Sequence, residues 1–210
     1  MRKSGLAPAA GIIDRIVSPR LALFAYGSLV SVASAERTLG RGIEHAGAAR
    51  LGGWRRRWSL ARDNLRSEKT FARPDGTTPP YCLGLNVDPG GGGVDPNGAL
   101  FEVSEEELDR LAVREIRYER IEVTGELAST AGAQFDRVFA FTAKREHFAP
   151  SPPAGAVILA TYALAVEAAF ETLGPNQLDA FRASTGPYPV EVIEATLVRD
   201  RIPPGNPRDW

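Results

Sequence analysis

The sequence predicts an α+β domain. Apolar runs of strand length alternate irregularly with helical segments, and there is no regular succession of strand, helix and strand, which argues against a doubly wound parallel sheet. The 210 residues are 43% hydrophobic, enough for one globular core that needs neither a disulfide nor a metal. We expect a loose arm over residues 1–20, one domain over 21–200 and an extended tail over 201–210, where three prolines restrict the backbone.

The start of the domain is expected to form a strand, a turn and a helix. The run Leu21–Tyr26 is apolar throughout and ends at Gly27-Ser28, a pair that favours a turn. A short helix is expected over Ser31–Leu39. Ser31 or Ser34 would cap it, because a serine hydroxyl accepts a hydrogen bond from the first helical turn.

Three further strands are expected before the middle of the chain. They are Ala49–Ala61, Tyr81–Val87 and Ala99–Val103. The loop Asp88–Gly98 separates the last two and contains four consecutive glycines, Gly90–Gly93. No Lys-Ser or Lys-Thr follows these glycines, so we interpret the segment as a plain mobile loop rather than a phosphate-binding loop.

The clearest helix start lies at Ser104. Glu107 follows three residues later, and this spacing is typical of a capping box. Leu108 and Leu111 give the helix an apolar stripe, and the helix is expected to end near Glu115 because a strand pattern begins soon afterwards.

The C-terminal half is expected to mix strands and helices. The strands are Ile121–Val123, Val138–Thr142, Val157–Ala160 and a closing strand Val190–Val198, and the helices are Ala165–Leu173 and Gln177–Ser184. Gly174-Pro175 separates the two helices, because neither residue continues a helix well.

Charge and cysteine content limit the classes of partner. The net charge is −1, so no overall field attracts nucleic acid or a membrane surface. The single cysteine, Cys82, is interpreted as a small buried hydrophobe in a reducing compartment. The N-terminal residues carry charges and prolines rather than the apolar run of a targeting segment, so we expect a cytoplasmic protein.

Several common kinds of catalytic site are not expected. His45, His147 and Cys82 have no spacing that is typical of zinc ligands. Ser28 lies in Ala-Tyr-Gly-Ser-Leu, which lacks the second glycine of a nucleophile elbow.

Two segments are harder to explain by structure alone. After Tyr26, the backbone N–H groups of Gly27, Ser28 and Leu29 precede a helix and would bind an anion such as a carboxylate, although a plain tight turn is the alternative. Glu115 lies where a helix ends and a strand begins, a junction that often lines a cleft. Its alternative is an exposed carboxylate paired with Arg114 or Arg117, which would contribute little to stability.

Together these segments resemble the γ-glutamylcyclotransferase-like superfamily. Its members open with a strand ending in Tyr-Gly-Ser-Leu or Tyr-Gly-Ser-Asn, as at Tyr26–Leu29. They later carry Leu-Asp-x-x-Glu and then Tyr-x-Arg, which match Leu111–Glu115 and Tyr118–Arg120 here. Ala112 stands where the family usually has the aspartate, and this departure leaves the substrate class open.

The resemblance covers about Leu23–Asp200, and Gly53–Trp58 is similar to the second strand of the family. It implies a mixed, partly closed β-barrel with flanking helices. It also implies an enzyme in which the α-amine of a γ-glutamyl amine or peptide attacks the γ-carbonyl and releases 5-oxoproline. The nucleophile comes from the substrate, so no cofactor or metal is expected, and the partner is a small γ-glutamyl molecule.

The resemblance also implies roles for individual residues. Glu115 would be the general acid/base, and Gly27, Ser28 and Leu29 would bind the substrate carboxylate. Tyr26 and Tyr118 would bind substrate or orient the loop, although they could equally be wall-packing aromatics. A tyrosine late in the chain, Tyr162, matches one seen in relatives and could cover the site.

Three other functions stay open at this point. The first is a different lyase or amide-processing activity on the same fold, since a fold does not fix a function. A non-enzymatic binding or interaction module on the same fold would keep the pocket without requiring a carboxylate at position 115. The arginine-rich segment Trp54–Arg66 is typical of single-stranded nucleic-acid binding. Its alternative is a strand with inward tryptophans and outward arginines, which we prefer, so no nucleic acid and no membrane are expected as partners.

Overall fold

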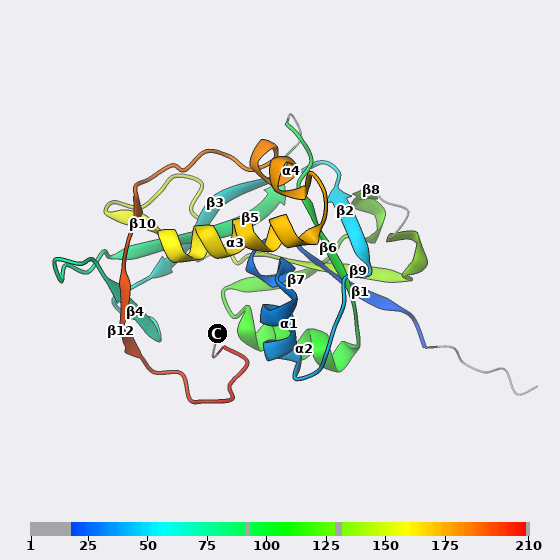
Figure 1. Cartoon of the computed structure of the whole chain (residues 1–210), viewed down its shortest axis with the longest axis horizontal. Helices are drawn as coiled ribbons and strands as arrows, with labels where there is room; N and C mark the ends of the chain where they lie inside the picture. The colour runs from blue at the N-terminus through cyan, green and yellow to red at the C-terminus, as the bar shows by residue number, and fades with distance from the viewer. Residues whose placement is uncertain (1–17, 91–92, 129–131, 209–210) are drawn as a thin grey trace, which may run out of the picture.

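The computed structural model describes residues 18–90, 93–128 and 132–208, so the loose arm expected over residues 1–20 lies almost entirely outside the described residues (Figure 1). The helices are α1 (Val32–Leu39), α2 (Glu105–Arg114), α3 (Ala160–Leu173) and α4 (Gln177–Ala183). The strands are β1 (Leu21–Ala25), β2 (Gly47–Leu51), β3 (Trp54–Asp63), β4 (Lys69–Ala72), β5 (Tyr81–Pro89), β6 (Asn97–Val103), β7 (Tyr118–Glu122), β8 (Leu127–Ala128), β9 (Arg137–Ala143), β10 (Ala156–Leu159), β11 (Val192–Ile193) and β12 (Thr196–Asp200). The predicted α+β class is confirmed.

Two mixed sheets curve toward each other, and β12 and β4 form a third, two-stranded sheet among the described residues. Within the described residues, the larger sheet has the order β7-β9-β1-β6-β2-β8 and the smaller one has the order β11-β10-β5-β3. The Asn86 side chain on β5 accepts a hydrogen bond from the Ala143 N–H on β9 at 2.7 Å, and the Thr142 hydroxyl donates to the Val87 carbonyl at 2.7 Å. This seam joins the two sheets into a partly closed barrel (Figure 1).

Strand β1 lies at the centre of the larger sheet. It pairs with β6 in antiparallel and with β9 in parallel orientation, and all five of its residues are buried. A strand covered on both faces needs apolar side chains at every position, which explains the uninterrupted run. At the end of β1, a Cβ on Gly98 would lie 2.7 Å from the Phe24 ring, so glycine allows β6 to approach there.

The helix caps follow the predictions. The Ser31 hydroxyl accepts the Ser34 N–H at 3.3 Å at the start of α1. Ser104 and Glu107 form the expected capping box at the start of α2, with bonds of 3.2 and 2.9 Å. Helix α2 ends at Arg114, and Glu115 is its C-cap residue. Helix α3 lies across the strands in Figure 1, above α1 and α2.

Some strand predictions were wrong. The single strand expected over Ala49–Ala61 is two strands, β2 and β3, because Gly52-Gly53 forms a turn with a left-handed φ of 78° at Gly53. The closing strand expected over Val190–Val198 is also two strands, and they join different partners. Strand β11 adds to β10, whereas β12 pairs with β4, a short strand that was not expected.

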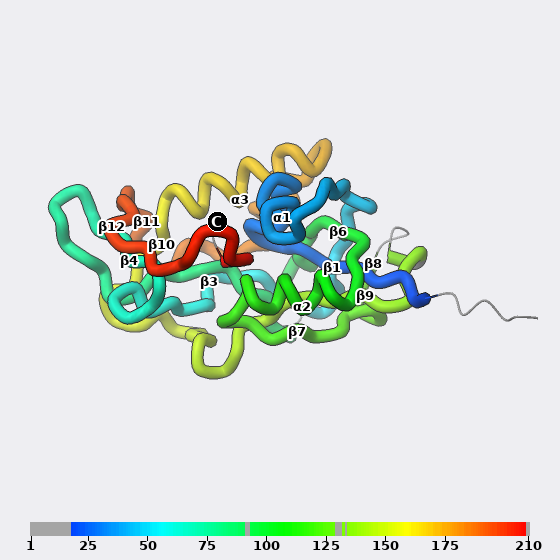
Figure 2. The backbone as a smooth tube through the Cα atoms, turned by 90° about the horizontal axis from the view of Figure 1, so that it is seen from below, coloured from blue at the N-terminus to red at the C-terminus, as the bar shows by residue number. Residues whose placement is uncertain are grey.

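The C-terminal segment turns back toward the domain instead of running out extended. The Asn206 N–H donates to the Pro203 carbonyl at 3.2 Å, and Gly205 has a left-handed φ of 77°. Arg208 then forms an ion pair with Glu68 at 2.7 Å. Figure 2 shows this segment running from β12 back toward α1.

Candidate functional site

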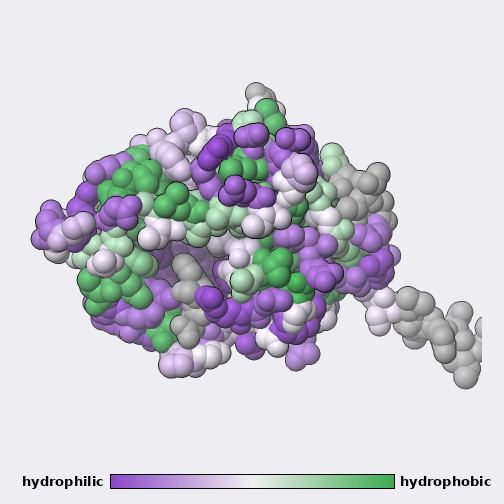
Figure 3. Space-filling model, in the orientation of Figure 1, coloured by the Kyte–Doolittle hydropathy of each residue, from purple (hydrophilic) through white to green (hydrophobic). Residues whose placement is uncertain are grey.

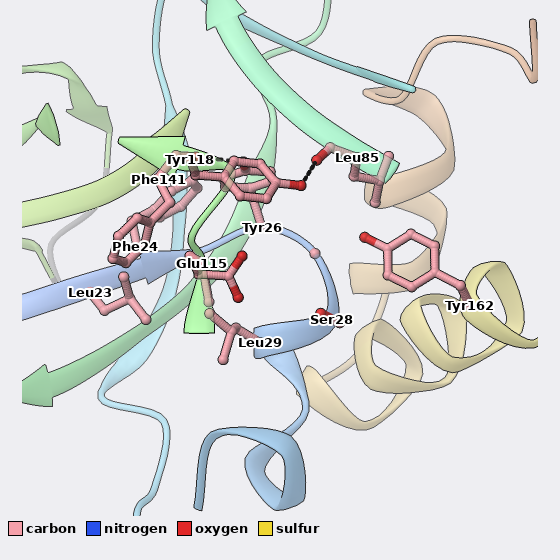
Figure 4. A pocket seen from close by; sticks show the side chains of 12 residues that line it. Leu23, Phe24, Tyr26, Ser28, Leu29, Leu85, Glu115, Tyr118, Phe141 and Tyr162 are labelled. Carbon is pink, nitrogen blue, oxygen red and sulfur yellow. Dashed lines mark hydrogen bonds between the residues drawn. The ribbon is translucent and has the colours of Figure 1, made fainter. Parts of the chain in front are cut away.

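A small cavity, which we call the inner bay, lies beyond the end of β1. It has a volume of about 40 Å³ and is lined by residues 23–29, Leu85, Glu115, Tyr118, Phe141 and Tyr162. Figure 4 shows the Glu115 carboxylate and the Tyr162 hydroxyl approaching this space from different elements. A cavity of this size holds one small polar group, such as a carboxylate.

A wider cavity of about 440 Å³, the outer chamber, adjoins the inner bay. Ser28, Glu115, Tyr118 and Tyr162 line both, so the two cavities meet at these side chains. The other walls of the outer chamber come from helices α1, α2 and α3 and from strands β3, β4, β5, β10 and β12. Figure 3 shows that the surface is hollowed below α3. Because the two cavities share lining residues, we treat them as one site.

The turn after β1 lines the inner bay. Ser28–Val30 form a short 3-10 turn in which the Val30 N–H donates to the Gly27 carbonyl and the Ser31 N–H donates to the Ser28 carbonyl. The N–H groups of Ser28 and Leu29 precede these bonds and have no partner within the turn. Both residues line the bay.

Tyr26 is fixed at both ends. Its hydroxyl donates to the Phe141 carbonyl at 2.5 Å, and its own carbonyl accepts a hydrogen bond from Arg56 at 3.2 Å. Both contacts are buried, so they exchange poorly with water and hold the first residue of the turn in place.

Arg56 joins the Tyr26 turn to the region around α4. It donates to the Asn97 carbonyl at 2.6 Å, to Asn97 Oδ1 at 2.9 Å and to the Ser184 hydroxyl at 2.8 Å. Its guanidinium also lies over the ring of Phe181 at 4.3 Å. Arg56 is 1% exposed, and burial lowers its pKa because it disfavours the charged form.

Glu115 reaches the boundary of the two cavities because it caps α2. Its backbone N–H donates to the Leu111 carbonyl, and its carbonyl accepts from the Tyr118 N–H, which places Tyr118 beside it. Its Oε1 lies 3.1 Å from Nε of Arg114, and its side chain is 17% exposed. The carboxylate is thus close to water in the outer chamber but largely enclosed.

Burial raises the pKa of Glu115, because it disfavours the charged carboxylate. The charges of Arg114 and Arg117 and the hydrogen bond from Arg114 oppose this effect without cancelling it. A carboxyl group with a raised pKa is better suited to take up and return a proton near neutral pH than an exposed one.

Three tyrosines surround the carboxylate as neutral hydroxyl groups. Burial raises the pKa of Tyr162 to about 12, and it raises the pKa of Tyr26 and Tyr118 well above the ordinary value. The negative charge of Glu115 raises all three further. The Tyr118 hydroxyl donates to the Leu85 carbonyl at 2.7 Å, which fixes its ring against the bay (Figure 4).

All six residues singled out in the sequence line the inner bay, namely Tyr26, Gly27, Ser28, Leu29, Glu115 and Tyr118. Tyr162 joins them from α3, with its hydroxyl oxygen 3.6 Å from where a Cβ on Gly27 would lie. The sequence predicts Arg114 only as a surface partner of Glu115, whereas Arg114 is buried and also bonds to Ser34 and Thr38 on α1. Its spacing of three from Leu111 was the available signal, because it places both side chains on one helix face.

The arginine-rich segment Trp54–Arg66 is only in part the strand with outward arginines that we preferred. Trp58 is buried and Arg55 is exposed, as expected, but Arg56 points inward. Arg55 and Arg57 both bond to Asp88 on β5, at 2.8 and 2.7 Å. Asp88 thus neutralises part of the charge of Arg55 and Arg57.

Among the described residues, no group of three His, Cys, Asp or Glu side chains is arranged to hold a metal ion. None of the described helices has the length and apolarity required to cross a bilayer.

No family model matches the sequence. No curated protein matches it. Among the solved structures that match, one named gamma-glutamyl cyclotransferase is 15% identical with a TM-score of 0.51, over 83% of this chain and 94% of that one. An uncharacterised protein from Homo sapiens is 16% identical with a TM-score of 0.54, over 84% and 95% of the two chains.

YkqA from Bacillus subtilis is 18% identical with a TM-score of 0.50 over 78% of this chain, which spans 53% of YkqA. At these identities the similarity concerns the fold. The chain has a γ-glutamylcyclotransferase-like fold, and the expected architecture is confirmed.

Proposed function

We propose that the protein is a γ-glutamylcyclotransferase that cleaves a γ-glutamyl amine or peptide and releases 5-oxoproline. The observation that carries this proposal is the position of Glu115. Its carboxylate, with a raised pKa, shares the inner bay with the backbone donors of the Tyr26–Leu29 turn. This arrangement occurs on a fold shared with a structure named gamma-glutamyl cyclotransferase.

In this proposal the substrate is held as a folded chain. The N–H groups of Ser28 and Leu29 bind its α-carboxylate, and Glu115 takes a proton from its α-ammonium group. The free amine then attacks the γ-carbonyl carbon and closes a five-membered ring. Holding the amine and the carbonyl together removes much of the entropic barrier.

The second proton transfer completes the reaction. Protonated Glu115 returns its proton to the nitrogen of the leaving amine as the original γ-amide C–N bond breaks. The ring nitrogen still carries two hydrogens, and it gives one of them to the regenerated Glu115 carboxylate, which passes it to the released amine. The products are 5-oxoproline and the amine as an ammonium ion, and Glu115 ends as a carboxylate. The atoms balance without water or a cofactor, since the substrate supplies the nucleophile. A single carboxyl group that serves both steps contributes roughly 10²–10⁴-fold.

The test is incubation of the purified protein with a panel consisting of a γ-glutamyl amine, a γ-glutamyl dipeptide and glutathione, with 5-oxoproline measured by chromatography. Formation of 5-oxoproline from at least one substrate is expected, both before and after treatment with a chelator. Tight binding of these compounds without turnover would favour the binding module instead. We further propose that the protein works in the cytoplasm, where its single cysteine would remain reduced.

A further inference from the structure

The outer chamber is lined by more cations than carboxylates. Glu68 and Glu115 are its only acidic lining residues among those described. Its cationic lining residues are Arg37, Arg62, Lys69, Arg114, Arg117 and Arg208. Such an excess in a partly enclosed space attracts an anionic group and repels a cationic one.

Most of these cations are held by the protein itself. Arg117 binds Glu68 through two bonds of 3.0 and 2.7 Å, and Arg208 binds the same carboxylate. Arg62 donates to the Lys69 carbonyl at 2.6 Å and lies over the ring of Phe71. These side chains set the shape and the positive potential of the chamber, and their hydrogen-bonding groups are already in use.

Arg37 differs from the others. It is exposed on α1, and its guanidinium makes no hydrogen bond or ion pair with any residue that the structure describes. It is close enough to Arg114 for its charge to lower the pKa of that buried guanidinium. An anion beside Arg37 would therefore relieve repulsion as well as gain a charged hydrogen bond.

Arg37 lies on the wall that leads outward from the inner bay. Ser28, Ser31, Ser34 and Arg37 follow one another at intervals of three residues, and all four line the outer chamber. The rise of a helix places the Arg37 backbone roughly 9 Å beyond Ser31. Its side chain leans back toward Ser34, because side chains on a helix tilt toward its N-terminus.

Apolar side chains also line the chamber. Leu60, Leu83 and Leu159 contribute to it, and Leu197 does so from β12. A leaving group that fills the chamber thus meets both apolar side chains and the Arg37 guanidinium. An aliphatic amino acid matches both, because it has an apolar side chain and a carboxylate, whereas the cationic amines of a polyamine would be repelled by the guanidinium.

We propose that the outer chamber selects γ-glutamyl substrates whose leaving group carries a carboxylate, an amino acid or short peptide with an aliphatic side chain, and that Arg37 binds this carboxylate. The inference rests on the proposed cyclotransferase activity, since it assigns the inner bay to the glutamyl part. Arg37 is then the residue that determines specificity, and it takes no part in the proton transfers.

The test compares substrates that differ only in the carboxylate. γ-Glutamyl-leucine, γ-glutamyl-leucinamide and γ-glutamyl-isopentylamine share the same aliphatic group, and only the first carries a negative charge on the leaving group. We expect kcat/KM for the first to exceed that for the other two by about 10–100-fold, mainly through KM, since one charged hydrogen bond accounts for this range. The preference should weaken as salt is added.

Variants identify the residue responsible. Arg37→Gln should reduce the preference to about twofold or less, and Arg37→Lys should retain part of it, because a lysine keeps the charge but not the fork of donors. Arg145→Gln is the matched control, since Arg145 is exposed and lines neither cavity, and it should keep the wild-type preference. Equal turnover of the three substrates, or a preference that survives Arg37→Gln, would overturn the inference while the proposed activity stands.

If none of the three substrates is turned over, the proposed activity fails, and calorimetric binding of the same compounds decides the inference separately. Tighter binding of γ-glutamyl-leucine that is lost in Arg37→Gln would support an anion-selective chamber. Equal binding of the three compounds would overturn it.

Discussion

The Oε1 atom of Glu115 lies 3.1 Å from Nε of Arg114, where the inner bay meets the outer chamber. Other nitrogens of the same guanidinium donate to the Ser34 hydroxyl at 2.8 Å and to the Thr38 hydroxyl at 2.5 Å. One side chain thus ties α2 to α1 and orients the carboxylate. Arg114 lowers the pKa of Glu115, and its contacts with α1 fix the position from which it does so.

Glu115→Gln should lower kcat for 5-oxoproline formation by at least about 100-fold, because glutamine keeps the size of the side chain but transfers no proton. The matched control is Glu119→Gln, which changes an exposed carboxylate on β7 and should leave kcat within about twofold. Circular dichroism would verify that both variants are folded. Wild-type turnover by folded Glu115→Gln would rule out the proton-transfer role.

The acidic limb of the pH profile should report on Glu115. Since burial raises its pKa, kcat/KM should begin to fall at a pH above the ordinary glutamate value of 4.5, as the base becomes protonated. Arg114→Met should move this limb to still higher pH, because Arg114 lowers the pKa of Glu115. Arg114→Lys keeps the charge and should move it less. A limb that stays at the same pH in Arg114→Met would show that another group is titrating.

Much of the fold follows from local sequence signals. The apolar run of β1, the Ser31 cap and the capping box at Ser104 act within a few residues, so their outcome does not depend on distant contacts. The pairing of β12 with β4 could not be inferred in this way. Both strands are short, and they are brought together by long-range contacts such as the ion pair between Lys69 and Asp200.

The candidate site likewise has residues that local sequence signals predict and residues that they do not. Glu115 and the Tyr26–Leu29 turn stand out as motifs, because their backbone positions are set by the ends of α2 and β1. The inward position of Arg56 could not be read from its neighbours, since alternation along an arginine-rich strand does not show which face holds the polar partners. Its partners, Asn97 and Ser184, come from other parts of the chain.

Arg56→Met should destabilise the fold by about 3–5 kcal/mol. Methionine has a similar length but no N–H group, so it leaves the buried carbonyls of Tyr26 and Asn97 without their donor. Arg55→Met is the matched control on the same strand. Arg55 is 53% exposed, and its ion pair with Asp88 should contribute less than about 1 kcal/mol. Urea denaturation would measure both, and equal midpoints would contradict the structural role of Arg56.

Glu68 should make stability depend on pH in the acidic range. Burial alone would raise its pKa, but hydrogen bonds from Arg117 and Arg208 outweigh burial and lower the pKa to about 2. The folded state thus favours the charged form relative to the unfolded chain, whose glutamate has the ordinary value of 4.5. The stabilisation is therefore complete above pH 4.5 and is lost as the pH falls toward 2.

Glu68→Gln should consequently lower the free energy of unfolding by roughly 2 kcal/mol at pH 7, and this deficit should shrink steadily when urea denaturation is repeated at pH 4 and pH 3. Glu194→Gln, which removes an exposed carboxylate between β11 and β12, should leave stability within about 0.5 kcal/mol at each pH. Arg208→Gln removes one of the two partners of Glu68 and should give a smaller deficit with the same pH trend. A deficit in Glu68→Gln that is constant from pH 7 to pH 3 would mean that the variant lost packing rather than the ion pairs, since only the ion pairs are linked to protonation of the carboxylate.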